Sequence, residues 1–311
     1  MSPGEAMRAF LIAFCAGMLS LMAALPARAE NCNLQRAASV DMGLDRAGRL
    51  TVPMSIGSQT VTMLLDTGGT SSMITDSVAA SLELTRKRLV GVRVMVYGGL
   101  MVDSFVVARD ISFGGLTAPN LKMLVMPDVG LPPGVGGAIA PDIMRAYDDE
   151  FDFANGKFNL VSPDHCEGQV VYWTKDYAKI DMRIDRDGHI AVPVAVDGKT
   201  AMFEFDTGAS ISVMDWDAAK ELFNLDEHSA VVTEVKQHSG RSVYKATFLK
   251  LTFGGGATGE VTVNNPDILL VPSDVSSMRR TNLLGIGILR QLHLYIAYRE
   301  GHLYVTPASA H

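Results

Sequence analysis

Apolar and polar residues alternate over short segments along most of the chain, which is the period of half-buried β-strands and not of helices. Turn sequences rich in glycine and aspartate separate these segments, and one of them, Asp45-Arg46-Ala47-Gly48, joins two alternating runs. Hairpins with a glycine at the tip are expected at 90–107 and 234–248, and short helices at 75–84 and 215–223. The pattern therefore predicts an all-β protein with a few short helices.

A long internal repeat divides the chain into two halves. Residues 38–82 align without a gap on residues 178–222, at a constant offset of 140, and 15 of the 45 aligned positions are identical. Both halves also end in a similar hairpin, so the repeat indicates duplication of one architecture. The predicted domains are an N-terminal lobe at 30–163, a linker at 164–177 and a C-terminal lobe at 178–311.

The repeat carries the triplet Asp-Thr-Gly twice, beginning at Asp66 and at Asp206, each time after an apolar run. This pattern predicts a buried strand that leads into a tight turn and holds the acid at its end. A single triplet is equally typical of an ordinary turn in which the aspartate caps its own backbone. Two copies in lobes related by a pseudo-twofold axis would instead face each other.

Two facing carboxyl groups suggest a specific chemistry. At a separation of about 3 Å they cannot both ionise, so the pair holds one proton over a wide pH range. One acid can then deprotonate a bound water while the other protonates a carbonyl oxygen. Such a pair would hydrolyse an amide without a covalent intermediate.

The first 29 residues have the pattern of a signal peptide. Arg8 precedes an apolar stretch over 9–25, and Ala27-Arg28-Ala29 supplies the small residues of a signal peptidase site. We expect cleavage after Ala29, export of the protein and a periplasmic location. A leader that is retained as a membrane anchor is the competing interpretation. The remaining 282 residues contain no further segment long and apolar enough to span a bilayer.

Two cysteines follow the leader, Cys32 and Cys166. In an oxidising compartment an even number favours a disulfide, which would tie the N-terminal end to the predicted linker. Neither cysteine has a histidine or another cysteine at metal-ligand spacing, so we expect no metal and no cofactor. Without the leader the formal charge is −8, from 25 basic and 33 acidic residues, and no basic run is interleaved with aromatic residues. Nucleic acid is therefore not an expected partner.

The doubled triplet, each copy followed about 70 to 80 residues later by an apolar segment of the kind at 137–144 and 284–289, resembles the aspartic peptidases. The short and still similar lobes resemble two retropepsin-like units fused in one chain. The resemblance implies a bilobal acid-protease-like β-barrel fold with pseudo-twofold symmetry. It also implies that Asp66 and Asp206 are catalytic and that Thr67 and Thr207 brace them by crossed hydrogen bonds.

The same resemblance gives roles to the residues around the pair. Gly68 and Gly208 would expose backbone to the substrate, and Thr70 and Ser210 would hydrogen-bond the outer carboxylate oxygens. The tips of the two hairpins take the place of flaps that close over a peptide. The flap candidates are Tyr97, Gly98, Gly99, Ser239 and Gly240.

Two departures from the family pattern lie in the first half. Gly69 stands where alanine or serine is usual, and Ala140-Pro141 replaces the glycine that Leu284-Gly285 keeps in the second half. The second departure raises a question about the packing beneath Asp66.

The sequence therefore predicts a monomeric aspartic endopeptidase that cuts extended polypeptides. The seven histidines are scattered, without the spacing of a metallopeptidase or a serine hydrolase. A peptide-binding protein that keeps the cleft but does not cut is the alternative, because fold alone does not guarantee activity.

Overall fold

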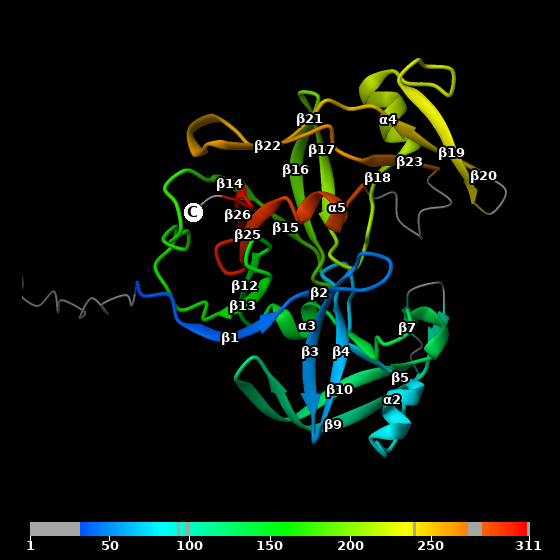
Figure 1. Ribbon diagram of the computed structural model, residues 1–311, viewed down its shortest axis with the longest axis vertical. Helices are drawn as coiled ribbons and strands as arrows, with labels where there is room; N and C mark the ends of the chain where they lie inside the picture. Colours follow the sequence, from blue (N-terminus) through cyan, green and yellow to red (C-terminus); the bar gives the residue numbers. More distant parts are fainter. Residues whose placement is uncertain (1–31, 92–93, 97–99, 239–240, 273–281, 310–311) are drawn as a thin grey trace, which may run out of the picture.

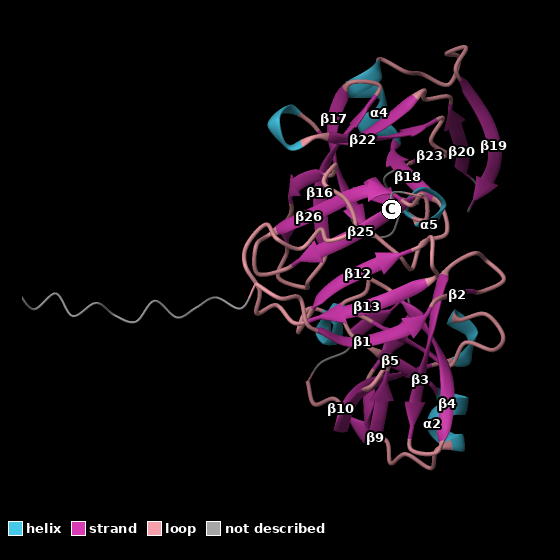
Figure 2. Cartoon of the chain, turned by 60° about the vertical axis from the view of Figure 1, so that its left-hand side comes forward, coloured by secondary structure: helices cyan, strands magenta, loops and turns pink. Residues whose placement is uncertain are grey.

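The computed structural model describes residues 32–91, 94–96, 100–238, 241–272 and 282–309. Two β lobes lie one above the other, and a third sheet lies between them (Figures 1 and 2). This architecture confirms the predicted all-β class with few and short helices. The predicted signal peptide at 1–29 lies outside the described residues.

The N-terminal lobe contains a closed six-stranded barrel. Its strands pair in the ring order β3, β4, β11, β5, β10, β9, and β9 returns to pair with β3. The barrel strands are β3 (Leu50–Ile56), β4 (Gln59–Leu65), β11 (Gly137–Ile139), β5 (Met73–Thr75), β10 (Leu116–Met126) and β9 (Ser104–Phe113). The short strands β2 (Gly43–Leu44) and β6 (Lys87–Arg88) extend the sheet at its edges. Alternate apolar residues such as Val52, Met54 and Met63 fill the interior, as the period of two requires.

The C-terminal lobe repeats this strand order, but two of its long strands are each interrupted and divided into two shorter strands. Its strands are β15 (Arg183–Ile184), β16 (Ile190–Val196), β17 (Lys199–Phe205), β18 (Ser212–Asp215), β19 (Val232–His238), β20 (Arg241–Ala246), β21 (Lys250–Gly254), β22 (Glu260–Asn264), β23 (Ile268–Val271) and β24 (Asn282–Leu284). Strands β20 and β21 together correspond to β9, and β22 and β23 together correspond to β10. The second break falls where Asn265 adopts a left-handed φ of 48° before Pro266, which has no N–H to donate to a ladder.

The third sheet is shared by both lobes and has six antiparallel strands. Its order is β1 (Arg36–Asp41), β13 (Lys157–Val161), β12 (Asp148–Asp152), β25 (Leu292–Ala297), β26 (His302–Pro307) and β14 (Ala178–Asp181). The order is symmetric about the centre of the sheet, because β1, β13 and β12 of the first half correspond to β14, β26 and β25 of the second. The two lobes are therefore joined directly by the pairing of β12 with β25 at the centre of the sheet.

Four short helices complete the described fold: α2 (Asp76–Ser81), α3 (Pro141–Met144), α4 (Trp216–Phe223) and α5 (Ile286–Leu289). Helices α2 and α4 begin at side-chain caps, because Thr75 accepts a hydrogen bond from the Val78 N–H and Asp215 accepts from the next turn. Two single 3-10 turns, η2 (Asp128–Gly130) and η3 (Gly256–Thr258), lie in loops. Among the described residues, no helix has the length and apolar character that crossing a membrane demands.

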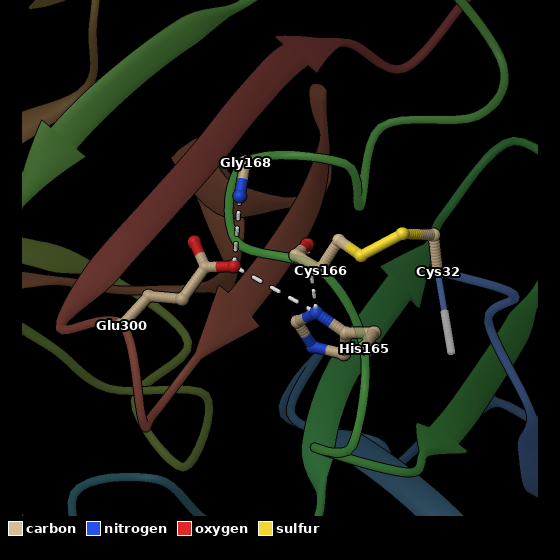
Figure 3. The surroundings of a disulfide bond; sticks show 5 residues. All are labelled: Cys32, His165, Cys166, Gly168 and Glu300. Carbon is tan, nitrogen blue, oxygen red and sulfur yellow. Dashed lines mark hydrogen bonds and ion pairs between the residues drawn. A yellow bond between two sulfur atoms is a disulfide. The ribbon is translucent and has the colours of Figure 1, made fainter. Parts of the chain in front are cut away.

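The segment predicted as a linker, 164–177, has no helix or strand and packs against the shared sheet. Val170 is fully buried, and the Trp173 ring stacks on His293 with ring centres 3.8 Å apart. The predicted disulfide between Cys32 and Cys166 is confirmed, and it ties the N-terminal end to this segment (Figure 3). The exact lobe boundaries stay a prediction.

Candidate active site

Asp66 and Asp206 lie directly after β4 and β17, the equivalent strands of the two lobes. The Asp66 N–H donates to the Ile139 carbonyl at 2.9 Å, and the Asp206 N–H donates to the Leu284 carbonyl at 3.0 Å. These acceptors end β11 and β24, which run parallel to β4 and β17. Each aspartate is therefore held at its backbone by the same pairing in both lobes.

The two triplets meet across the pseudo-twofold axis. A methyl group added to Gly68 would lie 2.5 Å from the Asp206 carboxyl carbon, and one added to Gly208 would overlap the Asp66 carboxylate. Because such contacts are impossible for a side chain, glycine is required at both positions. Each glycine thus allows the aspartate of the other lobe to approach, and the two carboxyl groups lie side by side.

Thr67 and Thr207 lie behind the pair and cross-link the two turns. The Thr67 N–H donates to the Thr207 hydroxyl oxygen at 3.0 Å, and the reciprocal hydrogen bond has the same length. The Thr67 hydroxyl donates to the Phe205 carbonyl at 2.8 Å, and the Thr207 hydroxyl donates to the Leu65 carbonyl at 2.5 Å. Both side chains are fully buried. This network fixes the relative position of the two turns.

Backbone N–H groups orient the carboxylates. Gly68 donates to Asp66 Oδ1 at 3.1 Å, and Gly208 and Ala209 donate to Asp206 Oδ1 at 2.8 and 3.1 Å. Thr70 and Ser210 are half-buried in the same turns. Within the described part of the chain, no hydrogen bond joins either hydroxyl to an aspartate, so their expected role stays a prediction.

The environment of the pair favours a shared proton. Each aspartate is half-buried and keeps part of its surface exposed. Burial raises the pKa of Asp66, although hydrogen bonds from the Gly68 N–H and the Asp206 side chain oppose it. Burial also raises the pKa of Asp206 well above its ordinary value, and the charges of Asp66 and Glu204 raise it further. The pair can therefore act as one acid and one base in the same site.

The two departures from the family pattern lie against each other in the first lobe. A methyl group at Gly69 would lie 3.1 Å from Asp66 Oδ2 and 3.3 Å from the Ala140 side chain. In the second lobe, a methyl group at Gly285 would lie 2.5 Å from the Ile211 carbonyl oxygen and 2.8 Å from the Ala209 carbonyl oxygen. Glycine at 69 thus leaves room for Asp66 and Ala140, and glycine at 285 is required by the backbone of its own lobe.

Three supporting residues were not singled out from the sequence. The Ser72 hydroxyl accepts from the Ala140 N–H at 3.0 Å and donates to Asp142 at 2.6 Å. In the other lobe the Ser212 hydroxyl accepts from the Gly285 N–H at 2.9 Å. Ser72 and Ser212 could have been found, because they are identical in the repeat. Asp142 has glycine at the equivalent position, Gly287, and no sequence signal pointed to it.

The hairpin predicted as the first flap is formed by β7 (Val94–Val96) and β8 (Leu100–Val102). Val96 and Val102 pack with Leu64, close to the Asp66 turn, in an apolar cluster separate from the barrel interior. The second candidate is the β19–β20 hairpin. All five flap candidates at 97–99 and 239–240 lie outside the described residues.

One group in the described chain has ligand atoms close enough together for a metal, formed by Asp185, Asp187 and His189. Asp185 accepts hydrogen bonds from the backbone N–H groups of the other two at 2.9 and 3.0 Å. These contacts are those of an exposed turn in which the Asp185 side chain caps the backbone that follows it.

Comparison with known proteins agrees with this geometry. A family profile described as "Aspartyl protease" matches residues 52–139 and 192–288, one match in each lobe. The fold is similar to the crystal structure of basic 7S globulin from soybean, with a TM-score of 0.55 at 9% identity over 90% of this chain and 98% of that one. No curated protein sequence matches the chain.

Proposed function

The chain belongs to the aspartyl protease family, and from that premise we propose that it is an aspartic endopeptidase that cuts extended polypeptides. The observation that carries the proposal is the meeting of Asp66 and Asp206 across the axis, each against the glycine of the other lobe. Two buried carboxyl groups in contact cost stability, because one of them must stay protonated. A protein that only binds peptides gains nothing from this cost.

In the proposed reaction, the ionised aspartate removes a proton from a water molecule that lies between the two carboxyl groups. The protonated aspartate donates its proton to the carbonyl oxygen of the scissile bond, and the water oxygen attacks the carbonyl carbon. The nitrogen of the tetrahedral intermediate then takes up the proton that the first aspartate removed from water. A hydroxyl group of the intermediate returns a proton to the second aspartate as the C–N bond breaks, which releases an amine and a carboxylic acid. Burial raises the pKa of both aspartates, so one of the two keeps its proton while the other acts as the base.

The proposed substrate is a peptide in extended conformation. Such a peptide could hydrogen-bond through its backbone while its side chains alternate between the two lobes. We further propose that the protein works as an exported monomer, in the periplasm. The disulfide between Cys32 and Cys166 is consistent with an oxidising compartment.

The test is digestion of a mixed peptide library by the chain from Glu30 to His311, at acidic to neutral pH. Asp66→Asn and Asp206→Asn should each lower kcat/KM by about three orders of magnitude or more, because the acid–base pair is lost. Asp110→Asn is a matched control, since it makes the same change at an exposed position of β9 with a left-handed φ of 53° that asparagine tolerates.

The library also separates cutting from binding. Capture of peptides without cleavage by the wild-type protein would favour the peptide-binding alternative. Cleavage that persists in either asparagine variant would remove Asp66 and Asp206 from the mechanism.

A further inference from the structure

A pocket outside the candidate active site lies where the two halves of the chain meet. Its volume is about 470 Å³, and it is lined by none of the residues assigned to the catalytic pair or its support. The walls are apolar and come from the first half, through Met42, Leu44, Leu50 and Phe153. Arg290, from the second half, is the one charged residue among the described residues that line the pocket. Pockets of about 300 to 1,000 Å³ with apolar walls and few polar groups are typical of small-ligand sites.

The guanidinium of Arg290 is the charged group of the pocket. The residue is exposed, and within the described ranges its side chain has no hydrogen bond or ion pair with another residue. The acids that lie next to the pocket walls in the sequence have partners of their own: Asp41 with Lys157, Asp45 with Arg49, and Asp152 with Asn155. The guanidinium is therefore available to an anion from outside the chain.

The pseudo-symmetric position shows a closed version of the same site. Helix α3 ends at Arg145 as α5 ends at Arg290. A methyl group added to Gly188 would lie 3.0 Å from the Pro141 side chain and 3.6 Å from the Arg145 guanidinium, so the turn at 185–188 closes over α3. At the equivalent Gly48, a methyl group would meet no atom of the described chain within 4 Å. The pocket thus lies beside the turn at 45–48, where the corresponding contact with α5 is left open.

The charges around the two arginines also differ. Asp142 lies in α3, three residues before Arg145. Burial raises the pKa of Asp142, and the charge of Arg145 is among the influences that oppose this rise. The equivalent position in α5, three residues before Arg290, is Gly287. The second half therefore has the cation without the carboxyl group that accompanies it in the first.

We propose that this pocket binds a small monocarboxylate with an apolar body, the chemistry shared by a medium-chain fatty acid and by the C-terminal end of a short apolar peptide. The carboxylate would accept two parallel hydrogen bonds from the Arg290 guanidinium, in the place that Asp142 takes near Arg145. The apolar body would lie against Leu44 and Phe153 and lose its contact with water. One negative charge and one apolar end match the single cation and the apolar walls. Because the pocket does not include the catalytic pair, the inference does not rest on the proposed function.

The experiment is isothermal titration calorimetry of the chain from Glu30 to His311 with decanoate below its micelle concentration. Acetate has the carboxylate without the apolar body and serves as the ligand control. N-acetyl-leucyl-leucine and its C-terminal amide test the peptide source of the same chemistry. We expect decanoate to bind saturably at one site and acetate to give no saturable signal.

Three variants locate the site, with melting temperatures to show that each is folded. Arg290→Gln should weaken decanoate binding by about ten-fold or more, because a hydrogen bond between two charged groups is lost. Leu44→Asp should also weaken it, since it puts a negative charge on the apolar wall at a side chain that is 54% exposed. Arg109→Gln removes the same charge at an exposed position of β9 outside the pocket and should leave the affinity unchanged.

The outcomes separate the two sources and the failure. Decanoate binding that only the two pocket variants weaken would support the inference with a fatty acid as the source. Binding of N-acetyl-leucyl-leucine, and not of its amide, with the same loss in Arg290→Gln would support it with a peptide end as the source. Absence of saturable binding of both carboxylates to the folded wild-type protein, or full affinity in folded Arg290→Gln, would overturn it. Neither result depends on peptide cleavage, so the proposed function is tested separately.

Discussion

At the scale of residues, the glycines and alanines of the two turns show how the duplicated site tolerates sequence change. Gly69 lies against the Ala140 methyl in the first lobe, whereas Gly285 lies against the carbonyl oxygens of Ile211 and Ala209 in the second. Because Gly69 and Ala140 are in contact, the two departures of the first lobe from the family pattern belong to one site. The close contact is visible only once the chain is folded.

This contact predicts a coupled pair of substitutions. Gly69→Ala should lower the free energy of unfolding by about 1 to 3 kcal/mol, because the new methyl would lie 3.1 Å from Asp66 Oδ2 and 3.3 Å from the Ala140 methyl. The double variant Gly69→Ala/Ala140→Gly has the residues of the second lobe and should recover the part of the loss that comes from Ala140, while the contact with Asp66 remains. Urea denaturation of both single variants and the double variant gives the coupling free energy. Additive effects would show that the two positions do not share one space.

At the scale of elements, β12 carries three consecutive acids into the interior of the shared sheet. Asp148, Asp149 and Glu150 are all buried, and histidines pair with two of them. His165 Nε2 lies 2.6 Å from Asp148, and His293 Nε2 lies 3.0 Å from Glu150. Asp149 has no cationic partner among the described residues and accepts a hydrogen bond from the Tyr298 hydroxyl at 2.7 Å.

Asp149 gives the fold a pH dependence with a definite sign. Burial raises the pKa of Asp149 to about 8 in the folded protein. In the unfolded chain the same carboxyl group has its ordinary pKa of about 3.9, so between these two pH values only the folded protein holds the proton. The folded state binds more protons between these values, and its stability therefore falls as pH rises through this range. The contribution reaches at most about 6 kcal/mol.

Asp149→Asn removes the carboxyl group that titrates and keeps an amide oxygen that can accept the hydrogen bond from Tyr298. We expect the variant to lose less stability than the wild-type protein between about pH 5 and 8, as measured by denaturant unfolding at each pH. Parallel curves for the two proteins would show that Asp149 does not hold its proton in the folded state.

At the scale of the whole molecule, the sequence predicted the duplication, the all-β class and the two facing triplets, because these are repeated local patterns. The shared six-stranded sheet was not predicted. The pairing of β12 with β25 joins residues such as Asp149 and Ile296, which are far apart in the chain, and no local pattern specifies such a partner. Asp142 was missed for a related reason, since its contact with Ser72 depends on the folded turn.

The disulfide spans 134 residues and closes almost the entire first half into a loop. Replacing Cys32 and Cys166 together by serine should lower the free energy of unfolding by about 2 to 5 kcal/mol, because the unfolded chain gains entropy. Chemical denaturation of the oxidised protein and of the double variant measures the loss. An unchanged midpoint would show that the bridge does not stabilise the fold.

The most direct test of the central claim compares peptide cleavage by the wild-type protein and by Asp206→Asn, with melting temperatures measured in parallel. We predict that the wild-type protein cuts a peptide at acidic pH. We also predict that the variant loses about three orders of magnitude or more in kcat/KM while it remains folded. A folded variant that cuts as fast as the wild-type protein would contradict the account.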